Sequence, residues 1–567
     1  MTIRIFIRIA VALVLACAGI GVVPGQVPRT PAEESRFNRY SQAEDIALFL
    51  SILDSASPRL AVRVVGQSAK SDSFPSRDLF LCILTANGVG EPGGLERTKP
   101  TLLVLASQHG NEQSAKEAAL GLIRDLAAGE LGRLLDRINV LVMPQANPYG
   151  NYFDVRTNEN GLDLNRDHVK VESEEVKAVH AVFRDWMPEV TLDVHEKGDD
   201  YYRVSVGCVS NANIDRRLQD YSRNRILPVI AKSLPKEGVT FHEYLVTEEM
   251  GINTSAGAAL RPEDTAGREE MTRFSTTDLN DGRNSLGIFQ TLSFIQEGAS
   301  RHDLAGLEAR TRWQSLGIRA LAEAVSANGP EILSLVRDLR ESLTEAAGSR
   351  PDRGLAHLRM TFARDADNPT LTIKAFEETK APVRGVLKVD KKSGDLLFSS
   401  DLLPGPSPAD RKIVERVIKN WFPNVVPALS VPRPPGYIVP AARSDIVEGL
   451  LRLGIEVDVF VRDGSLEIEA YRTTEVVPAK YDYLAPERIE VEKTISTTIV
   501  KKGDYFISSV QPGALLIPCL LEPQSESGFI RYRTYKLVLE AGNFFDILRL
   551  ARPQDLRVIP YRRWNRG

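Results

Sequence analysis

Cysteine and histidine are both scarce in this chain of 567 residues. The four cysteines, Cys17, Cys82, Cys208 and Cys519, are scattered, and no two of them form a CxxC pair. Their number and spacing do not match a disulfide framework or a cysteine-based zinc site. With only seven histidines in the chain, we expect any metal site to combine histidine with carboxylate side chains.

Long runs of one charge are also missing. The chain has 71 Lys and Arg against 75 Asp and Glu, which gives a formal net charge of −4. Without a basic cluster, a nucleic-acid partner is not expected. The 43% hydrophobic and 26% charged residues are typical of a globular protein, and the length predicts two or three domains.

The N-terminus has the parts of an export signal. Two arginines precede an apolar run at residues 9–23, and Val23-Pro24-Gly25 follows with small residues. This run is shorter than the roughly 20 residues that span a bilayer. We therefore predict a signal peptide at residues 1–25 and a periplasmic or secreted protein. The alternative is a lipoprotein, because Cys17 ends a Val-Leu-Ala-Cys sequence that resembles a bacterial lipobox; only lipidation or a retained signal implies a membrane.

Short apolar runs alternate with helical patterns in the first half of the chain. This alternation predicts an α/β catalytic domain at residues 30–325, with a mixed, largely parallel open sheet flanked by helices. The expected strands are 101–106, 138–143, 190–194 and 291–295, and the expected helices are 114–128, 173–186 and 304–326.

The second half differs in composition. Residues 355–400 and 455–540 are rich in Val, Ile, Thr and Tyr and are interrupted by Gly and Pro. This composition predicts mostly strands, with one helix at 444–453. We assign residues 330–567 to a β-rich accessory region whose role the sequence does not determine.

Chemically active side chains gather where the expected strands end. His109 and Glu112 follow the first strand of the regular region, and His195 follows the third. In an open α/β sheet, sites form at the carboxyl ends of the strands. Two histidines and one carboxylate, with a fourth position for water, make a catalytic zinc set. There is no HExxH motif to compete, because neither His195-Glu196 nor His242-Glu243 is followed by the second histidine.

Five sequence blocks occur in one order between residues 37 and 325. In these blocks the chain resembles the zinc metallocarboxypeptidases, of a bacterial, exported type with an additional C-terminal region. HxxE alone recurs by chance, whereas all five blocks in order are a specific signal. The blocks are His109-x-x-Glu112, Asn147-Pro148-Tyr149-Gly150, Asp163-Leu164-Asn165-Arg166, His195 after a strand, and Phe294-Ile295-Gln296-Glu297.

The resemblance implies a metal site and a general base. His109, Glu112 and His195 are implied to bind one zinc ion per chain. Glu297 is implied to take a proton from the metal-activated water and to return it to the leaving amine.

The resemblance also implies how substrate is held. Arg156 is implied to stabilise the oxyanion of the tetrahedral intermediate. Asn165 and Arg166 are implied to bind the free carboxylate of the substrate, which Arg can contact with two hydrogen bonds. Asp163 is implied to orient a zinc-bound imidazole.

The function implied is that of a metalloprotease, a zinc carboxypeptidase that hydrolyses a C-terminal peptide bond. A zinc amidohydrolase acting on N-acyl amino acids or peptidoglycan peptides is the alternative, since Asn165 and Arg166 suit both substrates. A more distant alternative is a non-catalytic binding protein on the same fold, although no metal ligand is lost and Glu297 is present.

Two features depart from the digestive members of the family. Those enzymes close over the substrate with a tyrosine about twenty residues before the catalytic glutamate, whereas this chain has no tyrosine between Tyr244 and Glu297. Glu196 places a second carboxylate directly after His195, and we expect it to point away into a salt bridge. The side-chain specificity and the oligomeric state are not predicted.

Overall fold

The computed structural model describes most of the chain after its first 26 residues. The predicted signal peptide and Cys17 lie outside the described residues, so export and lipidation stay predictions. Within the described part, no helix is long and apolar enough to cross a membrane. The described residues are 27–197, 203–249, 270–273, 275–299, 304, 306–349, 354–376, 387–389, 396–398, 412–478, 486, 488–537 and 539–562.

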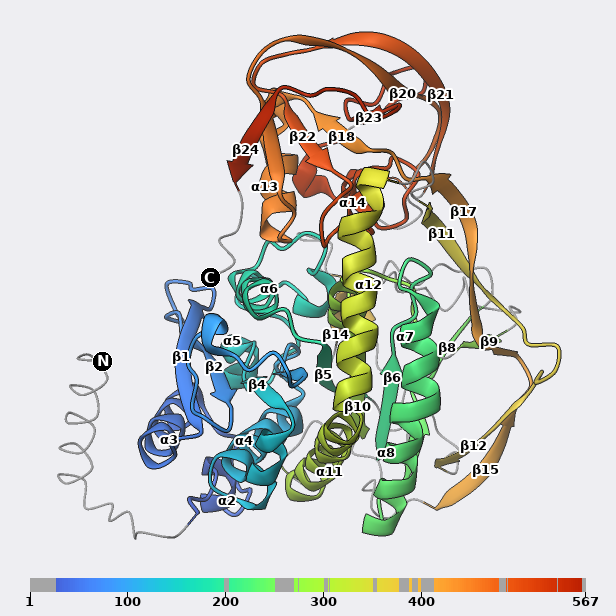
Figure 1. Cartoon of the computed structure of the whole chain (residues 1–567). Helices are drawn as coiled ribbons and strands as arrows, with labels where there is room; N and C mark the ends of the chain where they lie inside the picture. The colour runs from blue at the N-terminus through green and yellow to red at the C-terminus, as the bar shows by residue number, and fades with distance from the viewer. Residues whose placement is uncertain are drawn as a thin grey trace.

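An eight-stranded sheet organises the first half (Figure 1). Its central strands β4, β3, β5 and β10 are parallel, and antiparallel pairs join them to β2 and β6. The prediction of a mixed, largely parallel sheet is therefore confirmed. In spatial order the strands are β1 (Leu60–Gln67), β2 (Asp78–Leu84), β4 (Asn139–Met143), β3 (Thr101–Ala106), β5 (Val190–Lys197), β10 (Leu292–Ala299), β6 (Val204–Cys208) and β7 (Phe241–Glu243).

Helices bury the central strands, which explains their continuous apolar sequences. Every residue of β3, β4 and β10 is buried. Gln296 on β10 donates a hydrogen bond to Gln314 on α11 (2.6 Å), so α11 lies on the face of β10 that Gln296 occupies. The helices are α2 (Pro31–Glu34), α3 (Ala43–Ala56), α4 (Gln113–Ala127), α5 (Pro148–Phe153), α6 (Glu174–Trp186), α7 (Arg216–Tyr221), α8 (Leu227–Ser233), α10 (Gly282–Gly287), α11 (Leu307–Ala327), α12 (Gly329–Ser349), α13 (Ser444–Arg452) and α14 (Leu516–Leu521).

Two central strands are longer than the sequence predicts. β5 continues to Lys197 and β10 to Ala299, and His195 pairs in register with Glu297. The expectation that His195 lies just past its strand is therefore wrong. The last three residues of β5 are polar, so the apolar run in the sequence ends before the strand does. The strand continues because its parallel neighbour β10 still pairs with these residues.

Helix α12 was not expected, since the residues after 330 were assigned to a β-rich region. Its Arg340 donates hydrogen bonds to the carbonyl oxygens of Phe289 (3.1 Å), Met187 (3.1 Å) and Pro188 (2.7 Å). The first half of the chain thus holds α12 along part of its length, and in Figure 1 the helix runs from α11 toward the second large sheet. The domain boundary near residue 325 stays a prediction.

The second large sheet confirms the β-rich C-terminal region. Its strand pairs are antiparallel. One apolar core connects it to the first sheet, because Leu103 on β3 and Tyr437 on β18 belong to the same buried cluster. The order is β21 (Arg488–Val500), β20 (Gly464–Val477), β23 (Leu548–Leu550), β18 (Gly436–Val439), β22 (Tyr505–Ser508), β19 (Val457–Phe460) and β24 (Val558–Arg562).

The other described strands form smaller sheets. β16 pairs in parallel with β9, which links the C-terminal half to the first half through backbone hydrogen bonds. The groups are β8 (Val246–Glu249) with β9 (Glu270–Arg273) and β16 (Trp421–Phe422), β11 (Leu355–Ala363) with β17 (Asn424–Pro432), β12 (Leu371–Phe376) with β15 (Ile413–Ile418), and β13 (Leu387–Val389) with β14 (Leu396–Phe398).

The loop after β6 is held by the C-terminal half. The Asn213 side chain donates to the carbonyl of His357 on β11 (2.8 Å) and accepts from its N–H (2.8 Å). Thr277, in the loop before α10, donates to Glu526 (3.4 Å). The C-terminal half therefore contacts two loops of the first half directly.

We expect Asn213→Ala to lower the free energy of unfolding by about 1–3 kcal/mol, because it leaves the N–H and C=O of His357 without these partners. Urea unfolding followed by circular dichroism measures the loss. Asn368→Ala is the matched control, since Asn368 is exposed and its side chain bonds to the nearby Asp365 (3.1 Å). An Asn213→Ala protein as stable as this control would show that the contact of Asn213 with His357 does not stabilise the fold.

Candidate metal centre

The turn between β3 and α4 carries His109 and Glu112. Asn147 fixes this turn, because its side chain accepts from Gly150 N–H (2.8 Å) and donates to the carbonyl of Gln108 (3.1 Å). Gly110 allows the close approach, since a Cβ there would lie 2.0 Å from the backbone carbon of Gly150. The Asn-Pro-Tyr-Gly block thus acts by positioning the turn that holds the two expected ligands.

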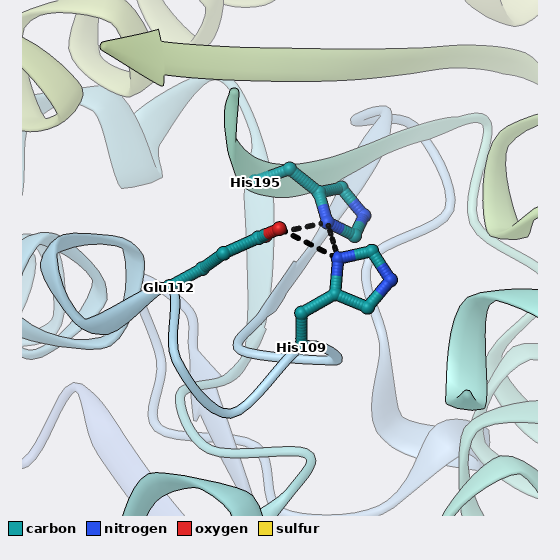
Figure 2. A group of neighbouring side chains, drawn as sticks. All are labelled: His109, Glu112 and His195. Atoms are coloured by element: carbon teal, nitrogen blue, oxygen red, sulfur yellow. Dashed lines mark hydrogen bonds and ion pairs between the residues drawn. The ribbon is translucent and has the colours of Figure 1, made fainter. Parts of the chain in front are cut away.

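Three side chains converge at this turn, as expected (Figure 2). Nδ1 of His109 lies 2.7 Å from Oε1 of Glu112, and Nδ1 of His195 lies 2.8 Å from Oε2 of the same carboxylate. The two Nδ1 atoms are 3.1 Å apart. All three residues are buried, and their donor atoms fit within 4.8 Å of one another.

The donor set fits zinc. Zinc binds imidazole nitrogen and carboxylate oxygen, and catalytic sites combine two histidines with one glutamate. Nδ1 of His109 and of His195 faces Glu112, while Nε2 of His109 is engaged 3.1 Å from Oδ1 of Asp163. The residues present therefore suit a single zinc ion on the Nδ1 side of both rings.

Asp163 joins three parts of the site. Besides His109, it accepts from Nε of Arg156 (2.8 Å) and from the N–H of Asn165 (3.0 Å). Burial alone raises the pKa of Asp163, but the positive charge of Arg156 and the contact with His109 outweigh it and hold this pKa well below its usual value. Asp163 is therefore a carboxylate at neutral pH.

Arg156 lies against the metal side of His109. Its Nη1 is 3.1 Å from Nδ1 of His109 and 3.7 Å from Oε1 of Glu112. Asp163 fixes the other edge of the guanidinium through Nε. A positive charge is thereby held next to the ligand cluster.

Asn165 and Arg166 are fixed by the loop before α10 and by its first residue. Oδ1 of Asn165 accepts from the N–H of Gly282 (2.8 Å), and the carbonyl of Arg166 accepts from Nδ2 of Asn280 (2.5 Å). Nη1 of Arg166 donates to the carbonyl of Asn165 (2.7 Å). Asn280 and Gly282 could not be predicted, because these contacts bridge more than a hundred residues and the segment from 250 to 287 matches no block of the family.

Glu297 lies beside the cluster on β10. Because it pairs in register with His195 on a parallel strand, the two side chains share one face of the sheet. The residue is buried, and Oε2 has no hydrogen-bond partner among the described residues. Burial raises the pKa of Glu297 to about 7.

Glu196 points away from the cluster, as expected. Its Oε1 accepts from the N–H of Ser114 at the start of α4 (2.7 Å), and its Oε2 forms a buried salt bridge with Nη1 of Arg310 on α11 (2.6 Å). Glu196 therefore anchors two helices to β5, and its carboxylate is already engaged.

Known proteins are similar to this chain in sequence. Residues 52–189 match the family model described as zinc carboxypeptidase. Carboxypeptidase 2 of Trichophyton tonsurans is 22% identical over 465 residues, which cover 78% of this chain and 75% of that protein. A protein named probable carboxypeptidase 2 of Arthroderma benhamiae is 24% identical over 74% of this chain and 72% of its own length.

Among solved structures, a metallo-carboxypeptidase from Burkholderia cenocepacia is 20% identical and aligns with 50% of this chain and 69% of its own, with a TM-score of 0.38. The family match spans the His109–Glu112 turn and the Asp163–Arg166 block, and His195 lies just beyond it on β5. Over residues 52–189 the chain is therefore similar to the zinc carboxypeptidases, and its buried His109, Glu112 and His195 form a potential site for a metal ion.

Proposed function

We propose that this protein removes residues one at a time from the free C-terminus of peptides. The observation that carries the proposal is the buried cluster of His109, Glu112 and His195 beside the unpartnered oxygen of Glu297. Zinc bound by the cluster supplies a Lewis acid that activates water and polarises the scissile carbonyl.

Glu297 serves as the general base and acid in this proposal. Its unpartnered Oε2 accepts the proton of the attacking water and then donates it to the leaving amine. The parallel pairing with His195 holds this carboxylate on the same face as the metal ligands. Glu196 is unavailable for this role, since the Arg310 salt bridge and the Ser114 N–H occupy both of its oxygens.

Arg156, Asn165 and Arg166 complete the proposed site. Arg156 stabilises the oxyanion with the guanidinium edge nearest His109. Asn165 and Arg166 hold the terminal carboxylate of the substrate, and the N–H of Gly282 supports this by fixing the Asn165 amide through Oδ1 (2.8 Å). Asp163 keeps His109 and Arg156 in a common orientation through its two oxygens.

Metal content tests the ligand assignment. We expect the purified protein to hold about one zinc ion per chain and the His109→Ala variant to lose it, because two remaining ligands do not complete a site. Elemental analysis after dialysis against a weak chelator measures the ratio. His242→Ala is the control, since His242 on β7 contacts the carbonyl of Glu243 and lies outside the cluster. Zinc retained by His109→Ala at the wild-type ratio would contradict the assignment.

The products identify the reaction. Mass spectrometry of a peptide library with free C-termini should show stepwise loss of single terminal residues. Cleavage confined to N-acyl amino acids or peptidoglycan peptides would instead favour the amidohydrolase alternative. Zinc binding without cleavage of any of these substrates would favour a binding protein on the same fold.

A further inference from the structure

We propose that Asp193 is a positioning residue for His195 and sets which nitrogen of that imidazole faces the metal. This inference rests on the proposed zinc site. Asp193 lies two residues before His195 on β5, so both side chains project from the same face of the sheet. Oδ2 of Asp193 is 2.8 Å from Nε2 of His195, and both residues are buried.

The geometry requires an acceptor at Nε2. A neutral imidazole carries one N–H, and a metal ligand must offer the lone pair of its other nitrogen. Nδ1 of His195 lies beside Glu112 (2.8 Å), a second ligand of the proposed site, so Nδ1 is the nitrogen that would bind zinc. The N–H of the neutral imidazole then resides on Nε2. The amide nitrogen of Asn165 is 3.2 Å from Nε2, but it is itself a donor and cannot accept this hydrogen. Asp193 supplies the acceptor.

A chain of buried polar groups holds Asp193 in place. Nε2 of Gln108 donates to Oδ2 of Asp193 (2.8 Å), and Oε1 of Gln108 faces Nε2 of His168 (2.8 Å). Nδ1 of His168 lies 3.1 Å from Nε2 of His180. In one consistent arrangement His180 donates to His168, His168 donates to Gln108, and Gln108 donates to Asp193.

The members behind Asp193 are neutral. Burial lowers the pKa of His168 to about 4, and burial also holds the pKa of His180 well below its usual value. Gln108 carries no charge. The chain therefore orients Asp193 through hydrogen bonds alone, and the carboxylate keeps its negative charge for His195.

Gly282 closes the space over Asp193. A Cβ at this position would lie 2.8 Å from Oδ2 of Asp193 and 2.9 Å from Nε2 of Gln108. Since both neighbours are fixed by hydrogen bonds, a side chain here would displace the carboxylate. Each histidine ligand thus has its own carboxylate at Nε2, Asp163 for His109 and Asp193 for His195.

Zinc affinity tests the inference without reference to hydrolysis. We expect Asp193→Ala to bind zinc about 10- to 100-fold more weakly than the wild type, since outer carboxylates have effects of this size on metal affinity. Asp193→Asn should lie between the two, because its amide oxygen still accepts from Nε2 but carries no charge. Competition with a chromophoric chelator gives the dissociation constants, and circular dichroism establishes that each variant is folded.

Glu522→Gln is the matched control. Glu522 is an equally buried carboxylate in the C-terminal half, where it accepts from Tyr437 (2.7 Å) and Arg549 (3.0 Å). We expect its zinc affinity to stay within about twofold of the wild type, because no metal ligand is near it. Cobalt substitution adds a second readout, since the visible spectrum should change in Asp193→Asn and not in the control.

The outcomes separate this inference from the proposed function. A wild-type protein that binds no zinc would overturn the metal centre itself. A wild type that binds zinc, with both Asp193 variants within twofold of it, would overturn only the positioning role. If Asp193→Ala does not fold, the Asp193→Asn affinity and cobalt spectrum decide.

Discussion

Glu297→Gln is expected to retain zinc and to lose about 100- to 10,000-fold in kcat, the range that proton transfer by a positioned side chain contributes. The carboxamide has nearly the shape of the carboxylate but cannot accept the proton. The unpartnered Oε2 of Glu297 is not needed to hold His109, Glu112 or His195, so the metal content should not change. Elemental analysis and steady-state kinetics on one peptide measure both quantities.

Glu243→Gln provides the control for this experiment. Glu243 on β7 forms a salt bridge with Arg223 (2.7 Å) and lies outside the ligand cluster, so its loss should leave kcat within a few-fold of the wild type. Near-normal turnover by Glu297→Gln would show that another group moves the proton. Glu196 is then a poor candidate, because Ser114 and Arg310 already occupy its oxygens.

The ligand cluster could be predicted because it depends on a general rule of open α/β sheets. Residues that follow neighbouring parallel strands meet at one edge of the sheet, and β3 and β5 are indeed neighbours. The location of His195 was less accurate, since it lies inside β5 and not after it. The error had no effect on the cluster because the strand end and the positions just before it project toward the same edge.

Some missed features had a local signal. Ile332, Val336 and Leu339 recur at the spacing of one helix face and are all buried on α12. Asp193 also had a local signal, because it lies two residues before His195 at an expected strand. Because side chains alternate between the two faces of a strand, residues two apart share a face. In the structure the Asp193 and His195 side chains are indeed in contact.

Other features had no local signal. The hydrogen bond from Gly282 to Asn165 spans 117 residues, and that from Asn213 to His357 spans 144 residues. Such contacts depend on the packing of the whole chain. The C-terminal half was expected to be β-rich, and it is, but its contact with the loops at Asn213 and Thr277 could be found only in the structure.

Arg166→Ala is expected to abolish most of the discrimination between peptides with free and with amidated C-termini. For the wild type, we expect amidation to lower kcat/KM by about 30-fold or more, because leaving a partly buried charge without its partner costs roughly 2–5 kcal/mol. The variant has no guanidinium that amidation would leave without a partner, so its kcat/KM values on the free and the amidated peptide should approach each other. Matched substrate pairs assayed on both proteins give the ratio directly.

Two further variants sharpen this test. Arg166→Lys keeps the positive charge but cannot make two parallel hydrogen bonds to a carboxylate, so its ratio should be intermediate. Arg63→Ala is the control, since Arg63 lies on β1 in a surface salt bridge with Glu91 and should leave the wild-type ratio unchanged. A ratio preserved in Arg166→Ala would mean that another group holds the terminal carboxylate.

Substrate length tests how much closure the proposed site needs. The sequence has no tyrosine between Tyr244 and Glu297 to close over a bound peptide, so a short substrate that needs less closure should be turned over well. We expect a dipeptide and an N-acyl amino acid to be cleaved at rates within about tenfold of a longer peptide. The reason is that a site with little closure makes few contacts to the part of a long peptide that lies beyond the scissile bond. Equal wild-type rates on free and amidated substrates would end the carboxypeptidase proposal and leave an endopeptidase or an amidase, both of which use zinc but neither of which needs Arg166 to pair with a carboxylate.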